Sequence, residues 1–152
     1  MRKLLVTALL ICALAFCLAG CQQTAQDDAA VKLYDAKVEY VGDASAVSGL
    51  LSVLLGDRMG LYTIELATDE EPYGLTLNFG AAAPDNAEME RCACVILGLV
   101  DNLSTVSWSS DTAIGGSLDL AGAEELVGKD PKSFASSPRR VKKLIDRLEL
   151  KF

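Results

Sequence analysis

The chain has 152 residues, with 14 basic and 21 acidic side chains and no histidine, so its net charge is −7 at neutral pH. This length suits a single domain. An acidic chain is a poor candidate for binding nucleic acid. The lack of histidine also removes the commonest general base and the commonest zinc ligand. We therefore expect no nucleic-acid partner, no bound metal and no cofactor.

Residues 1–20 have the parts of an export signal. Arg2 and Lys3 precede an apolar run, and Leu18-Ala19-Gly20-Cys21 resembles the lipobox of bacterial lipoproteins. A transmembrane anchor is the alternative, but the run is shorter than the roughly 20 residues of a membrane span. We expect Cys21 to carry a diacylglyceryl group and to anchor the mature protein on the extracytoplasmic face of the cell membrane.

Charge divides the mature chain into two parts. The signal contains two of the basic residues and none of the acidic ones, which leaves a net charge of −9 from Cys21 onward. Residues 21–128 have four basic and 18 acidic side chains, a net charge of −14, whereas residues 129–152 have eight and three, a net charge of +5. An acidic body thus precedes a basic C-terminal segment.

Residues 21–32 are small and polar, which predicts a tether and places the domain at residues 33–152. Alternation over residues 37–41 predicts a first strand. Asp43 then caps a helix with apolar residues at helical spacing up to Leu55. Residues 61–67 and 75–79 predict two more strands, joined by an acidic turn.

Further along, Asp85 and Glu88 have capping-box spacing and begin a helix whose apolar side runs from Met89 to Leu103. Residues 105–109 predict a fourth strand, and residues 115–117 a loop. Asp119 caps a short helix that Gly128 closes, and Ser137-Pro138 begins the last helix. This βαββαβ order with two C-terminal helices predicts an α+β fold, with an antiparallel or mixed sheet that has its helices on one face.

Some of these segments carry a resemblance. Tyr40-Val41-Gly42-Asp43 (Y-V-G-D), Glu71-Pro72-Tyr73-Gly74 (E-P-Y-G) and Leu99-Val100-Asp101-Asn102-Leu103 resemble an uncharacterised lipoprotein domain family of Gram-positive bacteria, a domain of unknown function. The resemblance covers roughly residues 33–150. Members also occur fused to antibiotic-responsive sensors of the membrane-metallopeptidase type, which implies a sensory role. The family has no established catalytic residues, and the Y-V-G-D and E-P-Y-G segments contain features that shape a cap and a hairpin.

The mature chain has two thiols besides Cys21. Cys92 and Cys94 are two positions apart, so on a helix they point about 200° away from each other. A buried, apolar role for Cys92 is favoured over redox or metal chemistry. The acidic run from Asp69 to Glu71 is interpreted as a solvated hairpin tip rather than a cation site.

The last predicted helix has a basic face. Its cationic side chains surround an apolar stripe and are Arg139, Arg140, Lys142, Lys143 and Arg147. One interpretation is a solvated helix packed on an acidic body. The alternative hypothesis is contact with an anionic membrane or wall polymer, which the lipid at Cys21 would bring within reach.

The function that these features favour is a non-enzymatic binding or envelope-sensing module with a membrane protein or an envelope ligand as partner. The alternative is a carboxylate-dependent hydrolase of cell-envelope material. The candidate carboxylates for that reaction are Asp43, Asp69, Glu70 and Glu71. It would require two carboxyl groups about 5 to 9 Å apart in a cleft.

Overall fold

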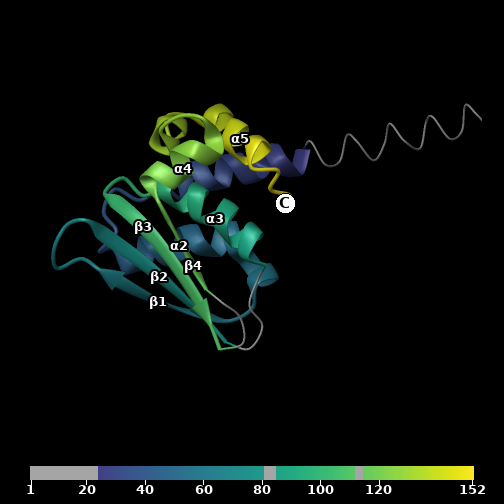
Figure 1. Ribbon diagram of the computed structural model, residues 1–152. Coiled ribbons are helices and arrows are strands. Elements are labelled where there is room, and N and C mark those ends of the chain that lie inside the picture. The colour runs from purple at the N-terminus through teal and green to yellow at the C-terminus, as the bar shows by residue number, and fades with distance from the viewer. Residues whose placement is uncertain (1–23, 81–84, 112–114) are drawn as a thin grey trace, which may run out of the picture.

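The computed structural model describes residues 24–80, 85–111 and 115–152. In this part of the chain a four-stranded mixed sheet is covered on one face by helices (Figure 1). The predicted α+β class, with helices on one face and two of them C-terminal, is therefore confirmed. The predicted signal and Cys21 lie outside the described residues.

The sheet has the strand order β1-β2-β3-β4. The strands are β1 (Tyr62–Ala67), β2 (Tyr73–Phe79), β3 (Leu103–Ser110) and β4 (Gly116–Asp119). β1 and β2 are antiparallel, β2 and β3 are parallel, and β3 and β4 are antiparallel. The parallel pair requires a crossover, which the helix between β2 and β3 provides.

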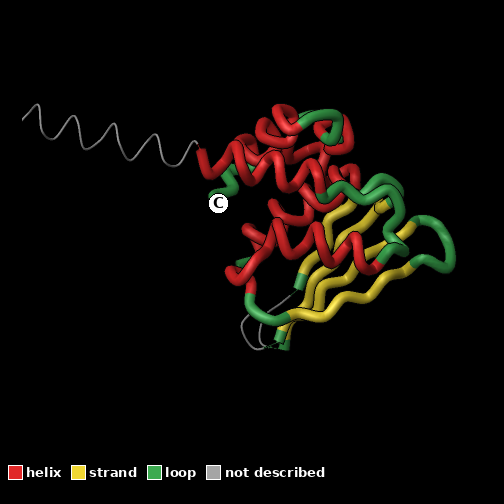
Figure 2. The backbone as a smooth tube through the Cα atoms, turned by 180° about the vertical axis from the view of Figure 1, so that it is seen from behind, coloured by secondary structure: helices red, strands yellow, loops and turns green. Residues whose placement is uncertain are grey.

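The helices form two layers above the sheet. They are a first helix at residues 24–35, α2 (Ala44–Leu55), α3 (Asn86–Leu99), α4 (Leu120–Val127) and α5 (Pro138–Arg147), with the short 3-10 turns η1 (Gly56–Met59) and η2 (Pro131–Phe134). Figure 2 shows all of these helices on the same side of the strands. α3 contacts β3 and β4 on one side and α4 and η2 on the other, so it is buried nearly all round, as its wide apolar arc predicts.

Helix ends follow the predicted caps. The side chains of Asp43, Asp85 and Asp119 accept hydrogen bonds from the backbone N–H of the third residue of α2, α3 and α4, at 3.0, 3.3 and 2.8 Å. Gly128 ends α4 in the left-handed conformation, with φ 74°. Ser137 precedes Pro138 at the start of α5, although its side chain makes no capping bond.

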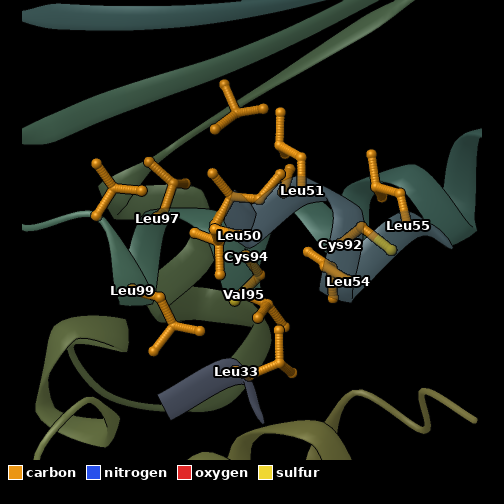
Figure 3. Packing of buried hydrophobic residues seen from close by; sticks show 14 of the residues in the cluster. Leu33, Leu50, Leu51, Leu54, Leu55, Cys92, Cys94, Val95, Leu97 and Leu99 are labelled. Carbon is orange, nitrogen blue, oxygen red and sulfur yellow. The ribbon is translucent and has the colours of Figure 1, made fainter. Parts of the chain in front are cut away.

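The core lies between the sheet and the helices and continues between α3 and the outer helical layer. Figure 3 shows Leu33 of the first helix close to side chains of α2 and α3. The inward side chains of β2, Leu75, Leu77 and Phe79, are at most 3% exposed. Among the described residues, the buried hydrophobic core runs from Ala29 to Leu150.

The opposite face of the sheet is polar. The side chains that alternate with the core positions are mostly hydroxyl or amide groups with two carboxylates: Thr63, Glu65, Thr76, Asn78, Thr105, Ser107, Ser109, Ser117 and Asp119. Asn78 Nδ2 donates to Glu65 Oε1 at 2.9 Å, and Ser109 Oγ donates to Asn78 Oδ1 at 2.7 Å. A polar row therefore crosses three strands on the face that has no helix.

Two expectations for the N-terminal part were wrong. Residues 37–41 form no strand. Their pairing is limited to a single parallel bridge between Val38 and Val100, at the end of α3. Residues 24–32, assigned to a tether, belong to the first helix. That helix buries Ala29 and Ala30, which are 7% and 2% exposed.

Two further boundaries differ from the prediction. The interpretation of residues 115–117 as a loop was wrong at 116 and 117, because β4 begins at Gly116 and pairs with Trp108 of β3. α3 ends at Leu99, so Leu103 belongs to β3 and not to the helix.

Candidate functional site

The turn between α3 and β3 is where distant segments of the chain meet. Val38 N–H donates to the Leu99 carbonyl at 2.9 Å, and Asp101 N–H donates back to the Val38 carbonyl at 2.9 Å. Val41 N–H donates to Asn102 Oδ1 at 2.8 Å. The loop before α2 is therefore held to this turn by both backbone and side-chain hydrogen bonds.

Aromatic contacts bring the β1–β2 hairpin to the same place. The rings of Tyr40 and Tyr73 are perpendicular, with centroids 6.4 Å apart. The Tyr40 ring lies over Gly42, where an added Cβ would be 2.2 Å from a ring carbon. Position 42 therefore has no room for a side chain while Tyr40 keeps this place. The Y-V-G-D, E-P-Y-G and Asn102 segments thus contact one another.

Lys132 of η2 completes the turn. Its Nζ donates to the carbonyls of Val100, Asp101 and Leu103, at 2.9, 2.5 and 3.0 Å. Burial lowers the pKa of Lys132, while the charges of Asp101 and Asp130 oppose that change. The ammonium group thus satisfies three carbonyls of the α3–β3 turn, next to the C-terminal end of α3, where the helix dipole favours a cation.

The sequence analysis did not identify Lys132 or η2. The signal was present in Asp130-Pro131, a capping residue followed by a proline at the first helical position. Asp130 does act as that cap and accepts from Lys132 N–H at 2.9 Å.

A surface pocket of about 510 Å³ lies at this end of the sheet. It is lined by residues of the hairpin, the α3–β3 turn, the start of α4 and η2: Glu71, Pro72, Asp101, Asn102, Leu103, Ser104, Leu120 and Lys132. Asn102 and Lys132 are already hydrogen-bonded to backbone groups. Glu71 and Asp101 are exposed, so this rim can accept hydrogen bonds from a cationic or amide group.

The four candidate carboxylates do not come together in the pocket. Glu71 lines it, but Asp69 and Glu70 are not among the lining residues. Asp43 caps α2 instead. The second carboxylate of the pocket is Asp101, which belongs to the Leu99–Leu103 segment of the resemblance but was not considered for chemistry.

Both cysteines of α3 are buried, with 0% exposure. Burial, with a smaller effect from Glu90, raises the pKa of the Cys94 thiol to about 12. Cys94 Sγ lies 3.8 Å from the Ala123 carbonyl of α4. Cys92 is a buried apolar residue as predicted, and Cys94 is buried too because α3 is covered on both sides.

Three of the five basic side chains on the predicted face of α5 form ion pairs or hydrogen bonds within the protein. Lys142 pairs with Asp146 at 2.8 Å and lies 3.9 Å from Asp27, and the bond to Asp146 raises the pKa of Lys142. Arg140 donates to the Ser133 carbonyl at 3.2 Å. Arg147 donates to the Val127 carbonyl and lies over the Phe134 ring.

The remaining two cations of this face, Arg139 and Lys143, are exposed, and neither has a partner among the described residues. They are four residues apart and therefore share one side of the helix. Within residues 24–80, 85–111 and 115–152, no helix is long and apolar enough to cross a membrane.

Comparison with known families identifies the chain over residues 33–119. It belongs to the family described as Domain of unknown function (DUF4825). The match begins in the first helix, ends with β4, and includes all three segments that meet at the α3–β3 turn. No curated protein and no solved structure matches the chain. The family region supplies the whole sheet, whereas η2 with Lys132 and α5 lie beyond it.

Proposed function

We propose that this protein is a lipoprotein, held on the extracytoplasmic face of the cell membrane through Cys21, whose domain is a non-enzymatic module that binds a partner protein or an envelope ligand. The anchor is supported by the export signal and by Leu18-Ala19-Gly20-Cys21. Binding is supported above all by one observation: segments far apart in the chain converge to form the acidic pocket beside the α3–β3 turn.

The state of the polar groups in the pocket favours binding over catalysis. Asn102 and Lys132 form hydrogen bonds to backbone groups at the turn, so these side chains stabilise the fold. The accessible carboxylates, Glu71 and Asp101, are exposed to water rather than enclosed. The exposed carboxylates of Glu71 and Asp101 fit a ligand that presents an ammonium or guanidinium group, because the nearby Lys132 ammonium is already bonded to backbone carbonyls.

The anchor is tested by Cys21→Ser. We expect this variant to keep its signal or to be shed into the medium, because the lipidated thiol is lost. Metabolic labelling with a clickable fatty acid, followed by fractionation of the cells, distinguishes these states. Membrane retention of the variant at its normal mature size would refute lipid anchoring.

The pocket is tested by site-specific photo-crosslinking in intact cells. A photoreactive residue at Glu71 should capture one membrane or envelope protein repeatedly, whereas the same residue at Glu125 of α4 should not. Asp101→Asn should reduce that capture, because it removes a carboxylate from the rim. Equal capture from both positions would contradict the proposal.

Enzymatic activity is measured on the same variants. Turnover of wall glycan fragments by the purified protein, abolished by Asp101→Asn or Glu71→Gln, would refute a non-enzymatic role. That outcome would support the carboxylate-dependent hydrolase instead. With a binding module, we expect no turnover and an unchanged fold in both variants.

A further inference from the structure

The first helix fixes the N-terminal end of the described chain to the outer helical layer. Ala29, Ala30 and Leu33 are 7%, 2% and 0% exposed, so its inner side is part of the body. Gln26 Nε2 donates to the Leu150 carbonyl at 2.7 Å, and Asp27 lies 3.9 Å from Lys142 of α5. The start of this helix is therefore held beside α5 and the C-terminal residues (Figure 1).

The distance from the lipid to this helix is short along the chain. Thr24 is the first described residue of the helix, and only Gln22 and Gln23 separate it from Cys21 in the sequence. Three residue steps span at most about 11 Å even when fully extended. This reach is about one helix diameter, so the lipid can be no farther than that from the α5 side of the body.

The α5 side, which this short connection brings to the bilayer, carries two exposed cations. Arg139 and Lys143 point outward from α5, whereas the other three basic residues of the helix are paired or bonded to backbone carbonyls. Anionic headgroups attract cations within about one Debye length of the surface. The sheet lies on the side of the molecule away from the start of the first helix (Figures 1 and 2).

We infer that the lipidated protein lies with the α5 side against the membrane, that Arg139 and Lys143 contact anionic headgroups, and that the polar sheet face is directed away from the bilayer. This orientation rests on the proposed anchor at Cys21. It goes beyond that anchor, because a long flexible tether would allow every orientation of the domain.

The orientation is tested with the full chain, lipidated in a bacterial host and reconstituted into phosphatidylcholine vesicles that contain a headgroup spin-labelled lipid. A bimane fluorophore is attached to Lys143→Cys or, as the matched control, to Ser117→Cys on the sheet face. Cys92 and Cys94 are buried and do not compete for the label. We expect quenching at position 143 and little at position 117.

A linker variant tests whether the short connection between Cys21 and Thr24 causes this orientation. A Gly-Ser linker of sixteen residues, inserted between Gln23 and Thr24, has a mean end-to-end distance of about 20 Å. It should abolish the quenching at position 143. Equal quenching at both positions, or none at position 143 in protein that floats with the vesicles, would overturn the orientation. Protein that does not float would refute the anchor itself, and the orientation with it.

The headgroup contact is tested separately with a chain that begins at Gln22 and so keeps every core residue. Its binding to phosphatidylglycerol vesicles at low salt should weaken about fivefold in Lys143→Gln, the effect of one basic residue near an anionic surface. Lys37→Gln, an exposed residue on the loop before α2, should change it little. Equal effects of the two variants, or no binding by the parent, would overturn the contact with anionic lipid.

Discussion

Asn102 joins the segment before α2 to the α3–β3 turn, and replacing it tests this view of the fold. Its Oδ1 accepts the Val41 N–H at 2.8 Å, and Val41 is 0% exposed. In Asn102→Leu the side chain keeps a similar size but loses the acceptor. The buried N–H of Val41 is then left without a partner.

The expected cost follows from that loss. An unsatisfied buried donor costs about 1–3 kcal/mol, so Asn102→Leu should destabilise the protein by that amount. Asn102→Asp is the matched control because its carboxylate can still accept the bond. It adds a negative charge near the C-terminal end of α3 and beside Asp101, which should cost less, about 0.3–1 kcal/mol.

Urea unfolding measures both variants. The chain has a single tryptophan, Trp108, which is 7% exposed on β3 and donates to Asn86 Oδ1 at 2.9 Å. Its fluorescence therefore reports the loss of the sheet and its contact with α3. If Asn102→Leu were as stable as the parent, or if Asn102→Asp lost as much stability as Asn102→Leu, the proposed role of this hydrogen bond would be wrong.

The other predictions concern stability and use the same unfolding assay. Gly49→Ala should stabilise α2 by about 0.5–1 kcal/mol, because nothing lies within 4 Å of the new Cβ. Gly98→Ala should instead destabilise the protein, because its Cβ would lie 3.0 Å from the Pro131 carbonyl oxygen. Glu149 follows α5 with φ 53°, so Glu149→Gly should stabilise by about 1 kcal/mol, and a loss of stability would contradict this. The Cys94 pKa is raised from 9.0 to about 12, so the folded state holds this proton more tightly and stability should fall as pH rises from 9 to 12. That slope, up to about 1.4 kcal/mol per pH unit, should be smaller in Cys94→Ala.

The elements that could be predicted from the sequence are those with strong local signals. α2 and α5 each combine a capping position with apolar residues at helical spacing, and these residues are buried as expected. β2 alternates regularly between buried and half-buried positions. Such patterns arise when one side of a helix or strand is buried along its whole length. They can therefore be recognised without knowledge of the neighbouring segments.

The errors occur where a neighbouring segment decides the conformation. The first helix escaped prediction because its buried side consists largely of Ala29 and Ala30, whose small apolar surface gives a weak periodic signal. Residues 37–41 alternate like a strand, yet the N–H of Val38 bonds to the end of α3 and that of Val41 to a side chain. Among the described residues this segment has only the single bridge from Val38 to Val100, so the local alternation misleads.

The candidate site shows the same dependence on long-range contacts. Glu71 and Asp101 are thirty positions apart in the chain and line the same pocket because β2 and β3 are parallel neighbours with Tyr73 opposite Leu103. The three-carbonyl contact of Lys132 further depends on η2 being placed against α3, where Gly98 permits an approach to Pro131 that a larger residue would crowd. The Y-V-G-D, E-P-Y-G and Leu99–Leu103 segments thus hold α2, α3 and the hairpin together. The pocket follows from that arrangement, which is why a change at Asn102 should affect mainly stability and a change at Asp101 mainly binding.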